Sequence, residues 1–353
     1  VMPRRASDSQ KITIAEVAQE AGVSIATVSR VLNRRDGKIK ISDETKQQVQ
    51  AAADRLGYQV DPFALALRTR RSGLVGAIIR DLRDPFLIEV FIEMQLLARE
   101  KGIELLLGNA NFDISVAGHQ ASIMNGLWFD GLILLGDMPG DLSVVNQLKH
   151  TRKPCVAVAS GTRHDLPSVN LDEVNSVHMA LKYLTDLGHR RIACVADPNL
   201  LGVRERLAAF QESAADFDLI LEDGYVQECA SNRNKAAACA LKLVDLPQPP
   251  TAILCGTDII ALGVMHQLAR TPFSVPQKIS VIGFDDIKEA ANTLPPLTTI
   301  RQPAAAIAAE ALNLLFKMID CQPGGDEAVS VLIQPQLVTR ESCAAPRATV
   351  MEG

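Results

Sequence analysis

The first 60 residues contain three short stretches in which apolar side chains recur every three or four positions, the spacing of one helix face. Thr13 precedes the first stretch as an N-cap, and Glu16 stands three residues on, where it can close a capping box. Gly22 follows and can turn the chain with a positive φ. The apolar positions of this first stretch are Ile14, Val17, Ala18 and Ala21.

Two further helices follow the glycine turn. Ser24 is the expected cap of a second helix with its body over 26–32, and Ser42 is the expected cap of a third helix that ends at Gly57. Two short helices joined by a three-residue turn containing glycine predict a helix-turn-helix over 14–33. The inward-facing residues are Val28, Val31 and Leu32 in the second helix and Val49, Ala52, Ala53 and Leu56 in the third.

The second helix is expected to expose short polar, small apolar and basic side chains with no acid among them. Hydroxyls and amides can bond phosphate oxygens or base edges, arginine can fork onto guanine, and small apolar groups can meet a thymine methyl. The alternative is a three-helix packing module with a solvated face. The expected exposed residues are Ser24, Ile25, Ala26, Thr27, Ser29, Arg30 and Asn33.

Beyond residue 72, apolar runs typical of strands alternate with helical stretches such as 86–101, 176–187 and 258–269. This rhythm is typical of parallel sheets covered by helices, and about 270 residues of it favour two doubly wound α/β subdomains. The expected strands are 74–79, 103–108, 131–136, 155–159, 191–196, 252–256 and 281–284.

Charge divides the chain in the same place. Residues 1–71 carry 13 Lys and Arg against 8 Asp and Glu, whereas the remainder carries 23 against 33. A small basic part on a large acidic part indicates that the first meets a polyanion and the second does not, although an excess of five charges is also common on a solvated surface. With 353 residues, the chain is long enough for two or three folding units.

Several function classes lack their signatures. No apolar run reaches the roughly 20 residues of a membrane helix, and the polar start lacks the apolar core of a secretory signal. Seven cysteines without C-x-x-C spacing predict reduced thiols in the cytoplasm rather than disulfides or a zinc site. Glycine-rich nucleotide loops, a G-x-S-x-G elbow and metal-ligand histidine spacing are all missing, so we expect no enzyme, no cofactor and no metal.

The sequence resembles the LacI-type repressors, the family of the lactose, purine and galactose repressors, from residue 12 to about 342. The resemblance implies a helix-turn-helix headpiece, a hinge helix, and a core of two α/β subdomains like periplasmic binding proteins, with a small effector in the cleft between them. It rests on Ala21-Gly22-Val23-Ser24 and Thr27-Val28-Ser29-Arg30-Val31-Leu32-Asn33 in the first part, and on Asp84-Pro85-Phe86, Ile282-Gly283-Phe284-Asp285-Asp286 and Pro295-Pro296-Leu297-Thr298-Thr299-Ile300 in the second.

The resemblance also implies roles in DNA binding. Ile25, Ala26 and Arg30 would read bases in the major groove, and Leu67 would wedge into the minor groove from a hinge helix. Asp61-Pro62 is a good start for this helix, which is too short to persist alone in water. The residues implied to hold phosphates are Thr13, Ser24, Thr27, Ser29, Asn33 and Thr45.

In the cleft, the resemblance implies that Phe86 packs on the effector, and that Arg206 and Asp285 form hydrogen bonds to it. The structural alternatives are a helix-start staple for Phe86, a surface ion pair for Arg206 and an N-cap for Asp285. Asp172, Thr257 and Asp258 are weaker candidates that we expect to be structural. Small residues at Ala159, Ala230 and Gly202 depart from many relatives and leave more empty volume, which indicates a bulkier effector or weak effector binding.

The leading hypothesis is a homodimeric repressor in the cytoplasm that binds a near-palindromic operator and answers to a sugar or nucleoside. The alternatives are a regulator whose second part docks a protein partner, and a solute-binding protein, which the first part argues against. The expected divisions are a disordered N-terminus at 1–11, a DNA-binding domain at 12–60, a hinge at 61–71, an effector-binding and dimerisation domain at 72–342, and a flexible tail at 343–353.

Overall fold

The structure is a computed structural model that describes residues 12–32, 41–59, 71–126, 129–137, 144, 146, 153–161, 166–320 and 329–346. The chain forms two compact units, Val1–Ser72 and Gly73–Gly353. The first unit is called the head below, and the second is called the body.

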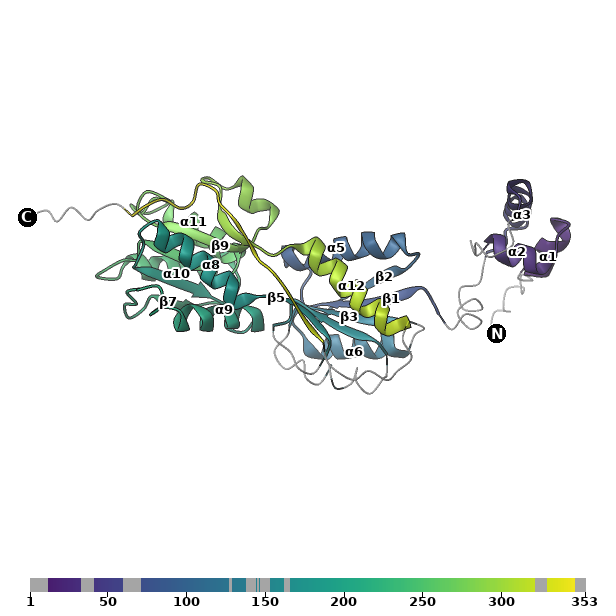
Figure 1. Cartoon of the computed structure of the whole chain (residues 1–353), viewed down its shortest axis with the longest axis horizontal. Helices are drawn as coiled ribbons and strands as arrows, with labels where there is room; N and C mark the ends of the chain where they lie inside the picture. Colours follow the sequence, from purple (N-terminus) through teal and green to yellow (C-terminus); the bar gives the residue numbers. More distant parts are fainter. Residues whose placement is uncertain are drawn as a thin grey trace, which may run out of the picture. The chain divides into compact units, whose positions relative to one another are not determined.

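The head is a three-helix domain of α1 (Ile14–Glu20), α2 (Ile25–Leu32) and α3 (Asp43–Leu56), drawn in purple in Figure 1. Its core contains Val17, Val28 and Val49, none of which is exposed to solvent. The capping box of Thr13 and Glu16 is present, and Gly57 ends α3 with a φ of 66°. The three helices predicted from apolar spacing are therefore confirmed.

The body contains two six-stranded sheets. The first, called the N-lobe sheet, is parallel throughout in the order β11-β5-β4-β3-β1-β2. Its strands are β1 (Leu74–Ile79), β2 (Glu104–Asn109), β3 (Gly131–Leu135), β4 (Cys155–Val158), β5 (Ser168–Leu171) and β11 (Ser330–Ile333).

The second sheet, called the C-lobe sheet, has the order β12-β10-β9-β8-β6-β7 and is parallel except where β12 pairs with β10. Its strands are β6 (Ile192–Ala196), β7 (Val226–Glu228), β8 (Ala252–Cys255), β9 (Ser280–Asp285), β10 (Thr298–Arg301) and β12 (Gln336–Val338).

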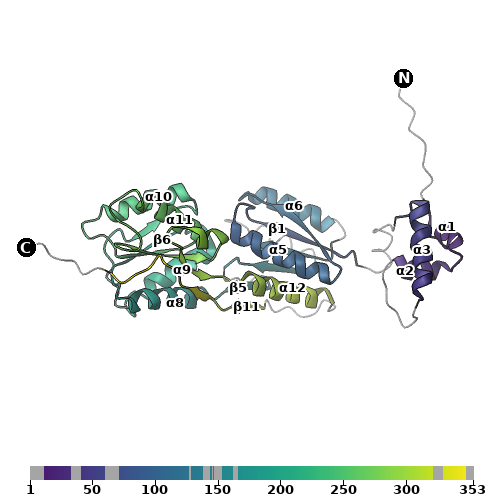
Figure 2. The same cartoon turned by 90° about the horizontal axis from the view of Figure 1, so that it is seen from above.

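Helices cover both faces of each sheet, as Figures 1 and 2 show. In the N-lobe, α5 (Pro85–Glu100) and α12 (Ala304–Asp320) pack on one face and α6 (Ile114–Gly126) on the other. In the C-lobe, α8 (Glu173–Asp186) and α9 (Leu201–Glu212) share one face, and α10 (Arg233–Val244) and α11 (Asp258–Leu268) share the other.

The chain passes between the lobes three times, after β5, after β10 and after β11. The N-lobe therefore takes α12 and β11 from near the end of the sequence. Two doubly wound α/β subdomains were predicted, and the structure confirms them. All seven predicted strands are present, but β5, β7, β10, β11 and β12 were not predicted because each has only three or four residues and several carry polar side chains.

One prediction about the C-terminal end is wrong. Residues 343–346, expected to belong to a flexible tail, are attached to the C-lobe. The Cys343 thiol donates to the Val281 carbonyl at 3.2 Å, and the Ala344 N–H donates to Ser280 Oγ at 3.0 Å. The Ala344 carbonyl lies 2.9 Å from Nε2 of the buried His189, so the ordered part of the lobe extends past residue 342.

Candidate nucleic-acid interface and ligand cleft

The outer side of α2 presents the side chains expected to meet DNA. Ser24, Ile25, Ala26 and Arg30 are exposed, and half of the Ile25 surface is open to solvent. Val28 is fully buried against α1 and α3, which fixes the rotation of the helix about its own axis. Because the buried face is committed to the core, the opposite face of α2 stays available to a partner.

The prediction that Ser29 is exposed is wrong. Only 9% of its surface is accessible, since Ser29 lies three residues before Leu32 and so shares the inward side of α2. Thr27 is half-buried, and its Oγ1 lies 2.9 Å from Ser24 Oγ. Asn33, the basic loop 34–40 and the hinge with Leu67 lie outside the described residues.

Hydroxyl groups cap the starts of all three head helices. Thr13 accepts from the Glu16 N–H, Ser24 from the Thr27 N–H at 3.1 Å, and Ser42 from the Thr45 N–H at 3.2 Å. The N-terminus of a helix carries partial positive charge and N–H groups without helical acceptors. The start of α2 has no acidic residue and is suited to a phosphate group, which is the role expected for Ser24. At α1 the Glu16 carboxylate already accepts from the Thr13 N–H and hydroxyl, and Asp43 and Glu44 lie in the first turn of α3, so these two starts favour the phosphate roles expected for Thr13 and Thr45 less.

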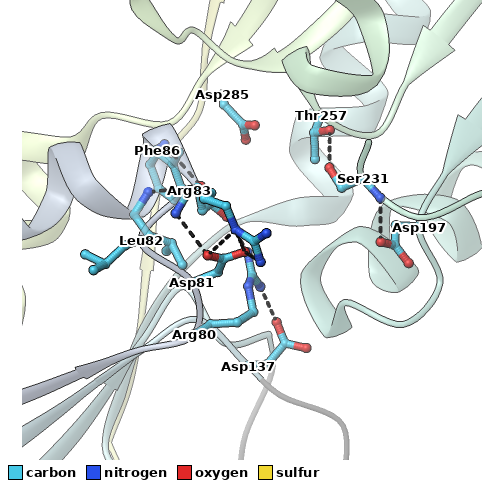
Figure 3. Close-up of polar contacts among 12 residues, drawn as sticks. Arg80, Asp81, Leu82, Arg83, Phe86, Asp137, Asp197, Ser231, Thr257 and Asp285 are labelled. Atoms are coloured by element: carbon cyan, nitrogen blue, oxygen red, sulfur yellow. Dashed lines mark hydrogen bonds and ion pairs between the residues drawn. The ribbon is translucent and has the colours of Figure 1, made fainter. Parts of the chain in front are cut away.

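In the body, charged side chains follow the carboxyl ends of the N-lobe strands (Figure 3). Arg80 comes directly after β1, and its guanidinium pairs with Asp84 and donates from Nη1 to Asp137 Oδ1 at 3.1 Å. Asp81 accepts from Arg83 Nε at 3.0 Å. Arg80 and Asp137 are both buried, so this pair is shielded from bulk solvent.

The C-lobe contributes a second set of polar groups to the same space. Asp197 follows β6 and accepts the Ser231 N–H at 2.7 Å, and Ser231 Oγ lies 2.9 Å from Thr257 Oγ1. Figure 3 shows Asp197, Ser231 and Thr257 facing Arg80, Asp81 and Asp137 from the opposite lobe. The two sheets thus turn their carboxyl ends toward each other, which is where ligands bind in open α/β folds.

Arg206, predicted to bind the effector, is already paired inside the C-lobe. Its Nε and Nη2 donate to the two Glu173 carboxylate oxygens at 2.6 and 3.0 Å, and its Nη1 donates to the Gly256 carbonyl at 2.8 Å. Its guanidinium also lies 3.7 Å above the Phe284 ring. Arg206 is therefore a buried residue of an internal ion pair. It is neither part of an ion pair on the surface nor open to a ligand.

Glu173 also occupies the volume expected to be empty near Gly202. A Cβ at position 202 would lie 2.9 Å from Glu173 Oε1, so the glycine makes room for this carboxylate. Glycine at position 202, which departs from many relatives, therefore makes room for the internal ion pair of Glu173 and Arg206 in this part of the cleft.

Phe86 and Asp285 lie at the cleft from opposite lobes (Figure 3). Phe86 is the second residue of α5, is 7% exposed and packs mainly in the N-lobe core. Asp285 ends β9 and accepts from Gln302 Nε2 at 2.6 Å, with Arg206 Nη1 at 3.8 Å. Burial raises the pKa of the Asp285 carboxyl well above its usual range, although the Arg206 guanidinium opposes this shift.

The three weaker candidates have structural contacts. Asp172 caps α8 by accepting the Asn175 N–H at 3.0 Å, and Thr257 caps α11. Asp258 is fully buried and accepts from Thr299 Oγ1 at 2.7 Å and from the Ile287 N–H at 2.9 Å. Asp258 therefore ties α11 to β10 and to the segment after β9.

Arg80, Asp137, Glu173 and Asp197 were missed as cleft residues. A usable signal existed for three of them, because Arg80, Asp137 and Asp197 follow predicted parallel strands within two positions. Glu173 follows the unpredicted β5 and gave no such signal.

The described segments lack two other kinds of feature. Among those residues, no group of three or more His, Cys, Asp or Glu side chains is arranged to hold a metal ion. None of the helices there has the length and apolar character needed to cross a membrane.

Comparison with known proteins gives two family matches. Residues 13–61 match the model described as bacterial regulatory proteins, lacI family, and residues 181–343 match the periplasmic binding protein-like domain. The chain is 31% identical to the HTH-type transcriptional repressor CytR of Escherichia coli K12 over 335 residues, which are 94% of this chain and 96% of CytR.

Two other likenesses cover most of the chain. Catabolite control protein A of Priestia megaterium is 31% identical over 88% of this chain and 93% of its own length. The lac repressor dimer bound to operator and the anti-inducer ONPF matches in fold with a TM-score of 0.81 and 23% identity, covering 95% of this chain and all of that one.

Proposed function

The chain belongs to the lacI family of bacterial regulatory proteins, and from this premise we propose that it is a transcriptional repressor that binds a near-palindromic operator as a homodimer. Residues 12–60 would bind DNA, 61–71 would form the hinge, and 72–342 would bind the effector and the second copy. The similar proteins CytR and PurR are both named transcriptional repressors.

The observation that carries the proposal is the outer face of α2. Ile25, Ala26 and Arg30 are exposed there, and no residue of α2 is acidic. Arg30 would donate to a guanine edge, and the two small apolar side chains would contact thymine methyl groups. The Ser24 hydroxyl and the start of α2, where the first turn has no acidic residue, would hold a phosphate and help to set the register of the head on the duplex.

Selection of DNA fragments from a random pool by the full chain tests this proposal. We expect enrichment of a near-palindromic site, and we expect Arg30→Ala to weaken binding to that site by roughly 10- to 100-fold, the loss of about one to three kcal/mol for one base contact. The control is Arg270→Ala, which removes an exposed arginine from the C-lobe of the body. Equal footprints from Arg30→Ala and the wild type would contradict the proposal.

For the effector, we propose a neutral, hydroxyl-bearing molecule of the sugar or nucleoside class. Arg80, Arg83 and Arg206 are each paired with a carboxylate already. A guanidinium that is paired in this way is less available to an anionic group, whereas the oxygens of the carboxyl groups can accept hydrogen bonds from hydroxyls. Phosphorylated sugars and nucleotides are thus disfavoured.

A thermal-shift screen of the full chain with matched pairs tests this choice. The pairs are D-ribose with ribose 5-phosphate, D-glucose with glucose 6-phosphate, and adenosine with AMP. A neutral member present at 100 times its dissociation constant adds about 2.7 kcal/mol to the free energy of unfolding, which raises Tm measurably. A shift from phosphorylated members alone would overturn the choice. A stoichiometric protein that co-purifies, with no shift from any compound, would favour control by a docked protein.

The homodimer is supported by apolar side chains on the N-lobe. β2 is an edge strand of its sheet, and Leu106 on this strand is 47% exposed. Ile92 and Leu96 on α5, the helix that packs beside it, are 43% and 54% exposed. An edge strand beside exposed apolar side chains is typical of a surface that a second protein copy covers.

A further inference from the structure

Helix α9 begins without a cap of its own. The N-cap residue is Leu200, whose side chain makes no capping hydrogen bond, and the first turn contains no acidic residue. The first N–H groups of a helix have no acceptor within the helix. Burial of this helix start against another element thus requires an acceptor from outside the helix.

The acceptor comes from the other lobe. The Leu201 N–H donates to Asp137 Oδ2 at 2.6 Å, and Asp137 lies just after β3 in the N-lobe. The second oxygen of the same carboxylate accepts from Arg80 Nη1 at 3.1 Å. Only 2% of the Asp137 side chain is exposed, so the carboxylate lies between a guanidinium and the positive end of a helix in a shielded place.

A glycine next to this contact brings the lobes closer together. Gly161 follows β4, the neighbour of β3, and has a φ of 69°. A Cβ on Gly161 would lie 2.6 Å from Leu201 Cβ, closer than real Cβ atoms approach, and 3.2 Å from Gly202 N, which is a tight contact. The start of α9 therefore rests directly on the ends of β3 and β4.

We infer that Asp137 holds the two lobes together by capping α9 across the cleft. Separation of the lobes would leave the Leu201 N–H without its acceptor and would expose the Arg80–Asp137 pair to water. The contact between the lobes is therefore stabilised by groups of the protein itself. Asp137 is a positioning residue for the cleft assigned above to the effector; its test needs neither effector nor operator, so its failure is distinguishable from failure of the proposed function.

Hydrogen–deuterium exchange of the full chain without ligand tests the inference. In the wild type, we expect the amides at the start of α9 to be protected. In Asp137→Ala, we expect exchange there to be roughly tenfold faster, the factor that corresponds to loss of one helix cap. The matched control is Asn232→Ala, which removes the cap of α10 within the C-lobe and should speed exchange at the start of α10 only.

A second variant disrupts the contact between Asp137 and Leu201 by steric overlap. Gly161→Ala should push Leu201 away and expose the same amides. Its control is Gly188→Ala, which has a similar backbone strain at a φ of 98° but whose Cβ would meet only Pro346, at 3.7 Å. This control should leave α9 protected.

Protection of the central strand β8 reports whether each variant remains folded. If Asp137→Ala fails to fold, Gly161→Ala decides. Unchanged exchange at Leu201 in the folded Asp137→Ala variant and in Gly161→Ala would overturn the inference. Faster exchange at α9 with the wild-type radius of gyration in small-angle X-ray scattering would also overturn it, because only a local cap is then lost. Faster exchange together with a larger radius of gyration supports the inference.

Discussion

Two consecutive aspartates at the end of β9 hold backbone conformations that residues with side chains rarely adopt. Asp285 has a φ of 117° and Asp286 a φ of 60°. Neighbouring groups hold both in place, because Gln302 donates to Asp285 and two arginines, Arg301 and Arg340, donate to Asp286 at 2.6 Å each. Strain of this kind persists only where surrounding contacts determine it, and it concentrates at ligand sites.

Asp258 should make stability depend on pH. Burial raises the pKa of its carboxyl to about 7, against the lowering effect of its bonds to Thr299 and Ile287. Because the folded chain then binds this proton more tightly than the unfolded chain, the free energy of unfolding falls as pH rises from about 4 to about 7. Asp258→Asn should reduce that slope, as measured by urea unfolding at intervals across this range.

The matched control for this prediction is Asp186→Asn, which changes an exposed carboxylate paired with Lys182. It should leave the slope as in the wild type. Glu173 and Asp285 also have raised pKa values, so part of the slope remains in Asp258→Asn. An identical slope in Asp258→Asn and the wild type would refute the assignment.

Individual site residues were predictable only in part. Arg30 stands out in the sequence because it sits on the polar face of a short amphipathic helix. The pairing of Arg206 with Glu173 could not be predicted from the sequence, because the two residues are 33 positions apart. Glu173 also follows the short strand β5, whose polar residues hide the apolar pattern typical of a strand. The strain at Asp285 was equally hidden, since tertiary contacts impose it.

At the level of helices and strands, local chemistry was a good guide wherever the chain supplies its own signals. The caps Thr13 and Ser42 and the terminating Gly57 place the ends of α1 and α3 where they were expected. Helix α9 is the contrary case, because its start depends on Asp137 from another lobe. The short strands β7 and β12, of three residues each, exist only through pairing with longer neighbours.

The contact between α10 and α11 reverses a common rule about helices. Alanine normally stabilises a helix relative to glycine. At Gly263 in α11, however, a Cβ would lie 2.4 Å from the Arg233 carbonyl oxygen and 2.9 Å from Ala236 Cβ. Gly263→Ala should therefore lower the stability of the body by about 1–3 kcal/mol, as expected for overpacking. Thermal unfolding of the variant checks this, and a raised Tm would contradict it.

At the scale of the whole molecule, the exposed apolar side chains of the N-lobe predict that two copies form a dimer. Leu96→Glu places a charge on the exposed apolar side of α5 and should shift the chain to a monomer at micromolar concentration, as measured by sedimentation. Operator binding should then weaken at least tenfold, because the two heads no longer bind as one unit. Ile220→Glu is the control, since it changes a similarly exposed apolar residue (48%) in the C-lobe. A dimeric Leu96→Glu protein would argue against this surface.

The alternation of strands and helices was enough to predict two doubly wound lobes, because each βαβ unit is local in sequence. Which segments complete each lobe was not predictable in the same way. The assignment of α12 and β11 to the N-lobe depends on long-range pairing, with β11 joining β5 across more than 150 positions.

The three passages between lobes set a condition on biosynthesis. Residues 330–338 supply the last strand of both sheets, so a nascent chain that is still short of this region can complete neither lobe while it emerges from the ribosome. The head is finished some 270 residues earlier in translation. A message truncated late in its reading frame would thus yield the three helices of the head without the complete lobes that the proposed effector needs.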